Sequence, residues 1–114
     1  MIVERTYSRV ASRTFQDFQV QVTAGDRYFA GELGDIAESG LCVLLPGAVR
    51  IADGEEIQGN VQSAHMPIQI QFQGRVAWTS EAVKGGRPCL LVGVAFEREI
   101  ELPPAVIALG MSAA

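Results

Sequence analysis

The sequence has 114 residues, enough for one compact domain that buries most of its apolar surface without disulfides or a structural metal. Hydrophobic residues make up 48% and charged residues 19%, which excludes a disordered chain, and twelve glycines with five prolines favour turns over long helices. The formal net charge of −4 excludes attraction of a nucleic-acid polymer by the average field of the surface, so any anion site must be local.

Basic residues gather near the N-terminus. Arg5, Arg9 and Arg13 stand beside a single acid, Glu4, so the first thirteen residues carry +2 and the rest of the chain carries −6. Taken alone, such a segment is most often a solvated tail.

The two cysteines and the distribution of apolar residues indicate a cellular compartment. Cys42 and Cys89 lie in the apolar runs LCVLL and PCLLV, which predicts buried thiols and no disulfide. No signal-peptide pattern is present, and no apolar stretch approaches the roughly 20 residues that span a bilayer. We therefore expect a cytoplasmic protein, or the cytoplasmic domain of a membrane-bound synthase, without direct membrane insertion.

The clearest predicted strand covers residues 67–78. From Ile68 to Gln73 three apolar residues alternate with three glutamines, which places the apolar side chains inward and the glutamines in solvent. Beyond Gly74 the alternation continues to Trp78 in the same phase, so we expect Trp78 in the core or at the barrel end and not in a ligand site. A glycine inside such a pattern marks a bend or bulge where a sheet curls, here at Gly74.

Five further segments have strand character, and a turn at residues 24–26 joins the first two of them into a hairpin. After Phe96 the pattern changes, and Ala105–Met111 is expected to form a short helix of about two turns with proline near its start. Short turns leave no room for crossover helices, so the predicted fold is an all-β, six-stranded antiparallel β-barrel with a short C-terminal helix. The five further strands are predicted at residues 18–22, 27–33, 40–45, 55–62 and 89–96.

Two short segments carry recognisable motifs. Arg5-Thr-Tyr-Ser-Arg9 matches R-x-x-x-R, and Asp35-Ile-Ala-Glu-Ser-Gly40 matches D/N-x-S-x-x-G except that Ala37 replaces the serine. They are followed in order by Gly74-Arg-Val-Ala-Trp78 and Gly93-Val-Ala-Phe96. Four such pieces in this order are specific together, and the chain resembles the PilZ domain family over nearly its whole length.

The resemblance implies a receptor for the bacterial second messenger cyclic di-GMP, with Arg5, Arg9, Asp35, Ala37 and Gly40 at the ligand site. Arginine suits this ligand because its planar guanidinium binds phosphate or guanine in bidentate fashion and stacks on bases. The Asp35 carboxylate can accept hydrogen bonds from guanine N1 and N2. Asp35 also suits the simpler role of capping a turn.

Departures from the family pattern predict weaker binding. Ala37 lacks a hydroxyl, which removes a hydrogen bond of about 0.5–1.5 kcal/mol, and Ser39 is a candidate replacement donor two positions later. Glu4 stands where family members often have another arginine, and Arg13 is a candidate to compensate for it, although an exposed arginine at a strand entrance is the simpler interpretation.

No catalytic or metal-binding constellation is visible, so we expect no enzyme and no cofactor. His65 stands alone in a turn without cysteine or carboxylate at metal-ligand spacing. Two acidic clusters fit solvated positions: Asp53, Glu55 and Glu56 in a turn, and Glu97, Glu99 and Glu101 at an exposed strand end.

Two functions remain open. In the first, one or two cyclic di-GMP molecules order the N-terminal arginine segment, and a fused effector or a separate protein reads the change in control of cellulose or other exopolysaccharide synthesis, motility or virulence. In the second, the chain is a degenerate PilZ domain that binds only proteins. The chain is either a whole protein or a fragment of a larger one, and the apolar 105–111 segment makes a homodimer possible. In the single domain we assign residues 1–13 to the flexible arginine segment, 14–97 to the barrel and 102–112 to the helix.

Overall fold

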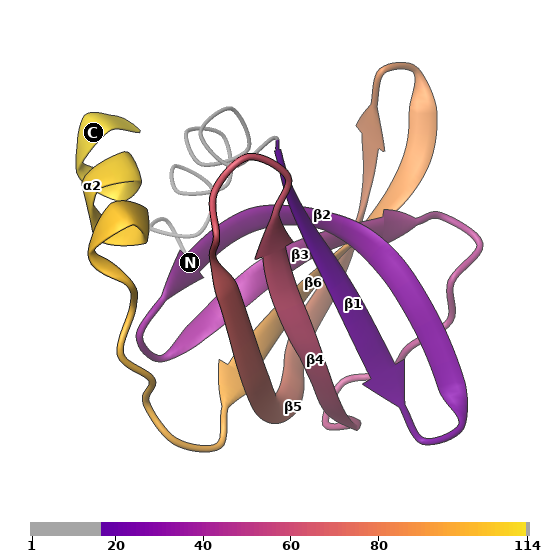
Figure 1. Ribbon diagram of the computed structural model, residues 1–114. Helices are drawn as coiled ribbons and strands as arrows, with labels where there is room; N and C mark the ends of the chain where they lie inside the picture. Colours follow the sequence, from indigo (N-terminus) through magenta and orange to yellow (C-terminus); the bar gives the residue numbers. More distant parts are fainter. Residues whose placement is uncertain (1–16, 114) are drawn as a thin grey trace.

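Six strands close into a barrel in the order β1-β2-β3-β6-β5-β4, and every neighbouring pair is antiparallel (Figure 1). The computed structural model describes residues 17–113, so the predicted arginine segment lies outside the described residues. The six-stranded barrel and the C-terminal helix are confirmed. The elements are β1 (Phe18–Ala24), β2 (Arg27–Ala37), β3 (Gly40–Pro46), β4 (Glu56–Ser63), β5 (Gln69–Lys84), β6 (Arg87–Phe96) and α2 (Pro104–Ala113).

The barrel interior is filled by the inward-facing residues that alternate along every strand. On β1, Val20 and Val22 have no exposed surface, whereas the glutamines between the buried residues are exposed, as the period of two predicted. Burial of seventeen apolar side chains in one contiguous cluster supplies the main stabilisation of the domain.

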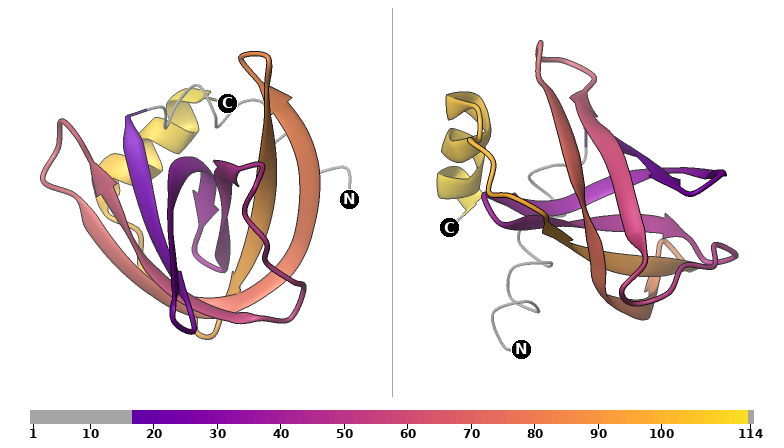
Figure 2. Two further views of the ribbon diagram at one scale, coloured as in Figure 1. Left: turned by 90° about the vertical axis from the view of Figure 1, so that its right-hand side faces the viewer. Right: turned by 90° about the horizontal axis from the view of Figure 1, so that it is seen from below.

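Two strands are longer than predicted. β2 continues through Leu33 to Ala37, so most of the second motif is strand and only Glu38 and Ser39 form the turn into β3. β5 continues past Trp78 to Lys84, and with β6 it makes a hairpin that extends beyond the barrel (Figure 2).

The register of the sheet shifts at two places. One shift lies between Leu33 and Asp35 on β2, and the other between Val76 and Trp78 on β5. The bend predicted at Gly74 is therefore wrong in position: Gly74 is buried and keeps regular pairing with Phe96, and a Cβ there would approach the Ala95 carbonyl oxygen to 2.2 Å. The glycine is required by close packing, and the bulge follows it.

The C-terminal helix is longer than the two turns predicted. α2 begins at the second of two prolines, where the missing N–H is not needed, and the Pro103 carbonyl accepts bonds from Val106 N and Ile107 N. Val106 is 2% exposed and packs on the barrel core, which fixes the helix beside the barrel (Figure 1).

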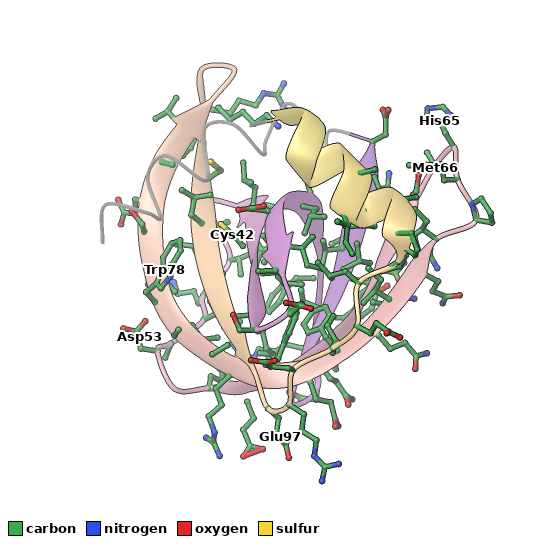
Figure 3. The ribbon with its side chains drawn as sticks, turned by 90° about the vertical axis from the view of Figure 1, so that its left-hand side faces the viewer. Cys42, Asp53, His65, Met66, Trp78 and Glu97 are labelled. Carbon is green, nitrogen blue, oxygen red and sulfur yellow. The ribbon has the colours of Figure 1, made fainter. Side chains whose placement is uncertain are left out.

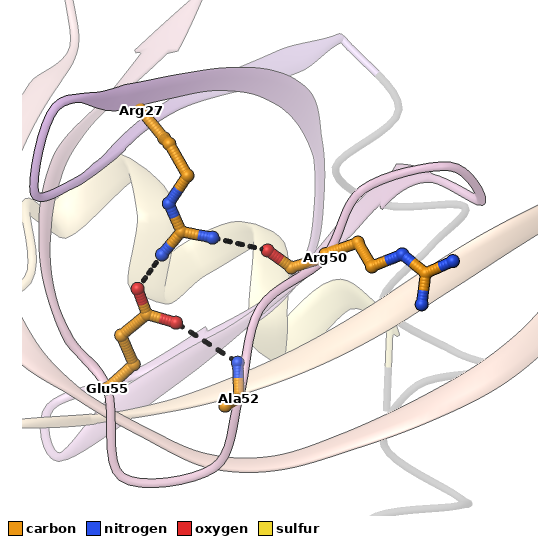
Figure 4. A network of polar contacts seen from close by, with 4 residues as sticks. All are labelled: Arg27, Arg50, Ala52 and Glu55. Carbon is orange, nitrogen blue, oxygen red and sulfur yellow. Dashed lines mark hydrogen bonds and ion pairs between the residues drawn. The ribbon is translucent and has the colours of Figure 1, made fainter.

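The loop between β3 and β4 is held by one arginine. Arg27 donates to the Arg50 carbonyl at 2.6 Å and pairs with Glu55, whose other carboxylate oxygen accepts from Ala52 N at 3.1 Å (Figure 4). The sequence predicted that Glu55 is solvated, and this prediction is wrong because the Glu55 carboxylate contacts both Arg27 and Ala52. Asp53 and Glu56 are exposed.

For a disulfide, a metal site and a membrane-spanning helix, the structure gives information on residues 17–113 alone. Cys42 is buried and Cys89 partly buried, and they form no disulfide. Within residues 17–113 no three His, Cys, Asp or Glu side chains gather as a metal site. No helix in that range has the length and apolar character needed to cross a bilayer.

Candidate functional site

The second motif lies at a tight hairpin between β2 and β3. Ala37 pairs with Gly40, and the two residues between them form the turn. The turn is fixed from the C-terminal side, because the Ser39 carbonyl accepts from Phe96 N and the Glu38 carbonyl accepts from Ile100 N, both at 2.9 Å. The turn of the motif is thus hydrogen-bonded to the last residue of β6 and to the segment that follows β6.

The bulge at Gly34 decides where Asp35 points. Leu33 faces the core, and in a regular strand Asp35 would face it too, two positions later. The extra residue reverses the phase, so Asp35 pairs with Cys42 on the outer face of the barrel, while Ile36 turns inward. The Asp35 side chain is 4% exposed, and its Oδ1 accepts from Ile36 N at 2.8 Å.

Two cross-strand rows on the outer face bring the motif together with β6 and β5. Four strands contribute one residue each to every row, and successive members are paired directly. The first row is Asp35, Cys42, Gly93 and Trp78, and the second is Ala37, Gly40, Ala95 and Arg75. We call the surface made by these eight residues the site face.

Trp78 belongs to the site face, so the prediction that it lies in the core is wrong. The bulge at Ala77 reverses the alternation, and Trp78 pairs with Gly93 on the outside (Figure 3). A Cβ on Gly93 would come within 2.2 Å of the indole ring, so the ring lies directly over the glycine.

Small residues make a shallow pocket of about 230 Å³ on this face. Gly40 lies against backbone, since a Cβ there would approach the Val94 carbonyl oxygen to 2.2 Å. The pocket is lined by Ala37, Ser39, Gly40, Leu41, Cys42, Ala77, Trp78, Gly93, Val94 and Ala95. None of these side chains is charged, so an anionic group bound here needs cations from elsewhere.

Arg75, the last member of the second row, was not among the predicted site residues. Its side chain is 65% exposed, and its guanidinium donates to the Gly54 carbonyl at 3.3 Å and pairs with Glu56 at 3.1 Å. The alternation of residues 67–78 already placed Arg75 outward, but its position beside Ala95 depends on strand register, which the sequence does not show.

The predicted site residues fall into two groups. Asp35, Ala37 and Gly40 are brought together on the site face. Ala37 and Gly40 line the pocket together with Ser39 of the exposed turn, whereas Asp35 is buried beside it and does not line it. Arg5, Arg9 and Arg13 lie outside the described residues. Their roles, and the replacement of a hydroxyl by Ser39, stay predictions.

Comparison with known proteins agrees with the motifs. No curated protein matches the sequence. Two solved structures are similar in fold. The PlzA protein of Borreliella burgdorferi in complex with c-di-GMP has a TM-score of 0.58 and 11% identity over 93% of this chain and 47% of that chain. The PilZ domain with c-di-GMP of YcgR from Escherichia coli has a TM-score of 0.56 and 16% identity over 84% of this chain and 83% of that one.

The chain spans about half the length of the Borreliella protein, so these likenesses concern the barrel domain. The family model described as PilZ domain matches residues 4–106, a range that includes the R-x-x-x-R segment, the second motif and all six strands. On that match the chain belongs to the PilZ domain family.

Proposed function

We propose that this chain is a cyclic di-GMP sensor domain that binds the nucleotide on the site face and orders its N-terminal arginine segment around it. The observation that carries the proposal is the row geometry: two register shifts bring Asp35 and Trp78 to the same outer face, across a floor of glycine and alanine. A base can approach such a floor closely because no long side chain stands on it.

Each part of the site face matches one part of the ligand. The Asp35 carboxylate is an acceptor for the guanine N1 and N2 donors, and the half-buried indole of Trp78 offers a surface for stacking. The described residues that line the pocket carry no charge to neutralise two phosphates, and Arg75 at the edge of the site face is already paired with Glu56. Arg5 and Arg9, within the range matched by the family model, are the proposed source of that charge.

The output is proposed to be conformational and not catalytic. A fused effector domain or a separate protein would read the ordered segment, in control of exopolysaccharide synthesis, motility or virulence, and the setting is proposed to be the cytoplasm. No cofactor other than the nucleotide is needed for this role.

A protein-binding module without nucleotide is the second candidate. It is favoured by Ala37, which lines the pocket where family members offer a hydroxyl. Losing one neutral hydrogen bond weakens binding by about tenfold at most, since the bond contributes about 0.5–1.5 kcal/mol. We therefore favour a weakened receptor over one that has lost its ligand.

Calorimetric titration of the purified chain with cyclic di-GMP, with GTP as control, tests the proposal. We expect micromolar or tighter binding, weakened by about 10- to 150-fold in Arg9→Ala and in Asp35→Ala because each removes a bond to a charged group. Arg50→Ala is the matched control and should bind as the parent does, because Arg50 is exposed and within residues 17–113 only its backbone carbonyl makes a hydrogen bond. The stoichiometry separates one bound nucleotide from two.

Trp78 gives an independent reading, because it is the only tryptophan in the chain. Ligand on the site face should change its fluorescence, whereas ligand bound elsewhere should not. Absence of both heat and fluorescence change at high nucleotide concentration, in a protein whose unfolding transition is cooperative, would leave the protein-binding module as the better account.

A further inference from the structure

Among the described residues, one edge of β5 has no partner strand over half of the length of β5. Pairing with β4 ends where Arg75 meets Glu56, and two loop bonds then join Val76 to Gly54 and Glu55. From Ala77 to Lys84 the described residues offer β5 only one neighbour, β6. This part of the hairpin extends away from the barrel (Figure 2), and we call the open side of Ala77–Lys84 the free edge.

The hairpin turn determines which backbone groups face the free edge. Gly85 and Gly86 both have positive φ, 59° and 77°, as in the two-residue turns whose flanking residues exchange backbone hydrogen bonds. Lys84 and Arg87 are therefore a hydrogen-bonded pair, and the alternation of an antiparallel ladder follows from them.

By that alternation Ala82, Ser80 and Trp78 bond to β6, whereas Val83, Glu81 and Thr79 direct their N–H and C=O groups to the free edge. Pro88 agrees with this assignment, because it pairs with Val83 at a position that donates nothing to β5. These three alternate residues leave their backbone N–H and C=O groups free of β6, and such a row is a template on which another strand can pair.

The free edge begins at the site face. Ala77 and Trp78 are its first two residues, and both line the pocket. A strand added along the free edge would therefore border the pocket directly, one strand spacing of about 4.8 Å from β5.

The N-terminal segment of this chain suits the free edge by reach, pattern and charge. Between Arg9 and Asp17 lie eight residue steps, which span up to about 29 Å, comparable with molecular extents of 32 × 31 × 28 Å. Arg5 and Arg9 are an even number of residues apart, so in a strand they project from the same face. The segment is basic, and the free edge offers one exposed acid, Glu81, while its one cation, Lys84, is already paired with Glu32 at 2.7 Å.

We propose that cyclic di-GMP binding adds the segment around Arg5–Arg9 to the free edge as a seventh strand, which holds both arginines beside the pocket. This inference rests on the proposed function. It names the free edge as the backbone surface to which the arginine segment binds. It also predicts which backbone amides become protected from hydrogen exchange.

Amide hydrogen exchange by NMR, on the whole chain with and without cyclic di-GMP, tests the inference. We expect the amides of Thr79, Glu81 and Val83 to exchange at least about tenfold more slowly in the complex, because each gains a strand hydrogen bond. Glu81→Pro removes one outward N–H without breaking the ladder to β6, and Glu81→Ala is its matched control, since it keeps the N–H.

Glu81→Pro should bind the nucleotide about two- to tenfold more weakly than Glu81→Ala, the loss expected of one or two hydrogen bonds. Binding with unchanged exchange at the free edge, or equal affinity of the two variants, would overturn the strand addition and leave the sensor function standing. Protection accompanied by a doubled mass in light scattering would overturn it in favour of a second copy at the edge. Absence of any binding would remove the sensor function as well.

Discussion

Two outer surfaces of the barrel differ in the size and polarity of their side chains. The site face has glycine and alanine at four of its eight positions, so backbone lies at the surface. The outer surface of β1, β4 and β5, which we call the amide face, has long uncharged side chains in three cross-strand rows. These are Gln19, Gln62 and Gln69; Gln21, Asn60 and Gln71; and Thr23, Gln58 and Gln73.

The two faces also differ in the size of their hollows. Two larger depressions, of about 760 and 570 Å³, are lined in part by Gln58 and Gln73 of the amide face, against about 230 Å³ on the site face. The smaller pocket combines an indole with close-lying backbone, and two residues of the family motif, Ala37 and Gly40, line it. A ligand on the amide face would instead meet flexible amides, which lose side-chain entropy when they are fixed.

The largest effect is expected where the site face has no space for a side chain. Gly40→Ala places a Cβ at 2.2 Å from the Val94 carbonyl oxygen, and backbone on both strands must move. We expect the free energy of unfolding to fall by about 1–3 kcal/mol, with loss of nucleotide binding. Urea denaturation measures the first and calorimetry the second. Ser39→Ala, at the exposed turn next to it, is the control for stability, and an equal fall in both would refute the packing argument.

Trp78 and Gly93 should depend on each other. Gly93→Ala brings a Cβ within 2.2 Å of the indole ring, so the ring must shift and the variant should be destabilised. In a Trp78→Ala background the same change meets no ring. A double-mutant cycle by urea denaturation should therefore give a coupling of about 1–2 kcal/mol. Additive effects would mean that the indole does not occupy the space over Gly93.

Much of this architecture follows from sequence patterns alone. The period of two correctly placed the apolar residues inside and the glutamines outside, and turn residues located every strand, because a half-buried sheet imposes both patterns locally. The orientation of the site residues did not follow in the same way. Asp35 and Trp78 both point outward because a bulge precedes each of them, and a bulge is a property of two paired strands.

The bulge on β5 explains why the alternation gave the wrong face for Trp78. The pattern from Ile68 onward is regular, and nothing in Ala77 itself announces an extra residue. The pairing partner Gly93 is the informative position, since it leaves space that a side chain from the next strand can fill. A tryptophan and a glycine late in the chain can be matched only once the register between β5 and β6 is known.

Ala37→Ser should increase nucleotide affinity at the site face. The hydroxyl that family members carry would line the pocket again, and one added hydrogen bond should tighten nucleotide binding by about two- to tenfold. Calorimetry on Ala37→Ser, Ser39→Ala and the double variant shows whether Ser39 now serves as the replacement donor. If it does, Ser39→Ala weakens the parent more than it weakens Ala37→Ser. No gain in Ala37→Ser would mean that the ligand does not reach this part of the pocket.

The smallest effect is expected on the amide face. Gln71→Ala removes one exposed side chain from the middle row of the amide face, and the structure shows no hydrogen bond from this side chain among the described residues. Surface substitutions of this kind change the free energy of unfolding by no more than about 0.5 kcal/mol. Nucleotide affinity should stay unchanged because Gln71 lies outside the site face. Urea denaturation and calorimetry check both values. A loss of affinity in Gln71→Ala, with stability intact, would move the ligand to the larger hollows and reverse the assignment of the two faces.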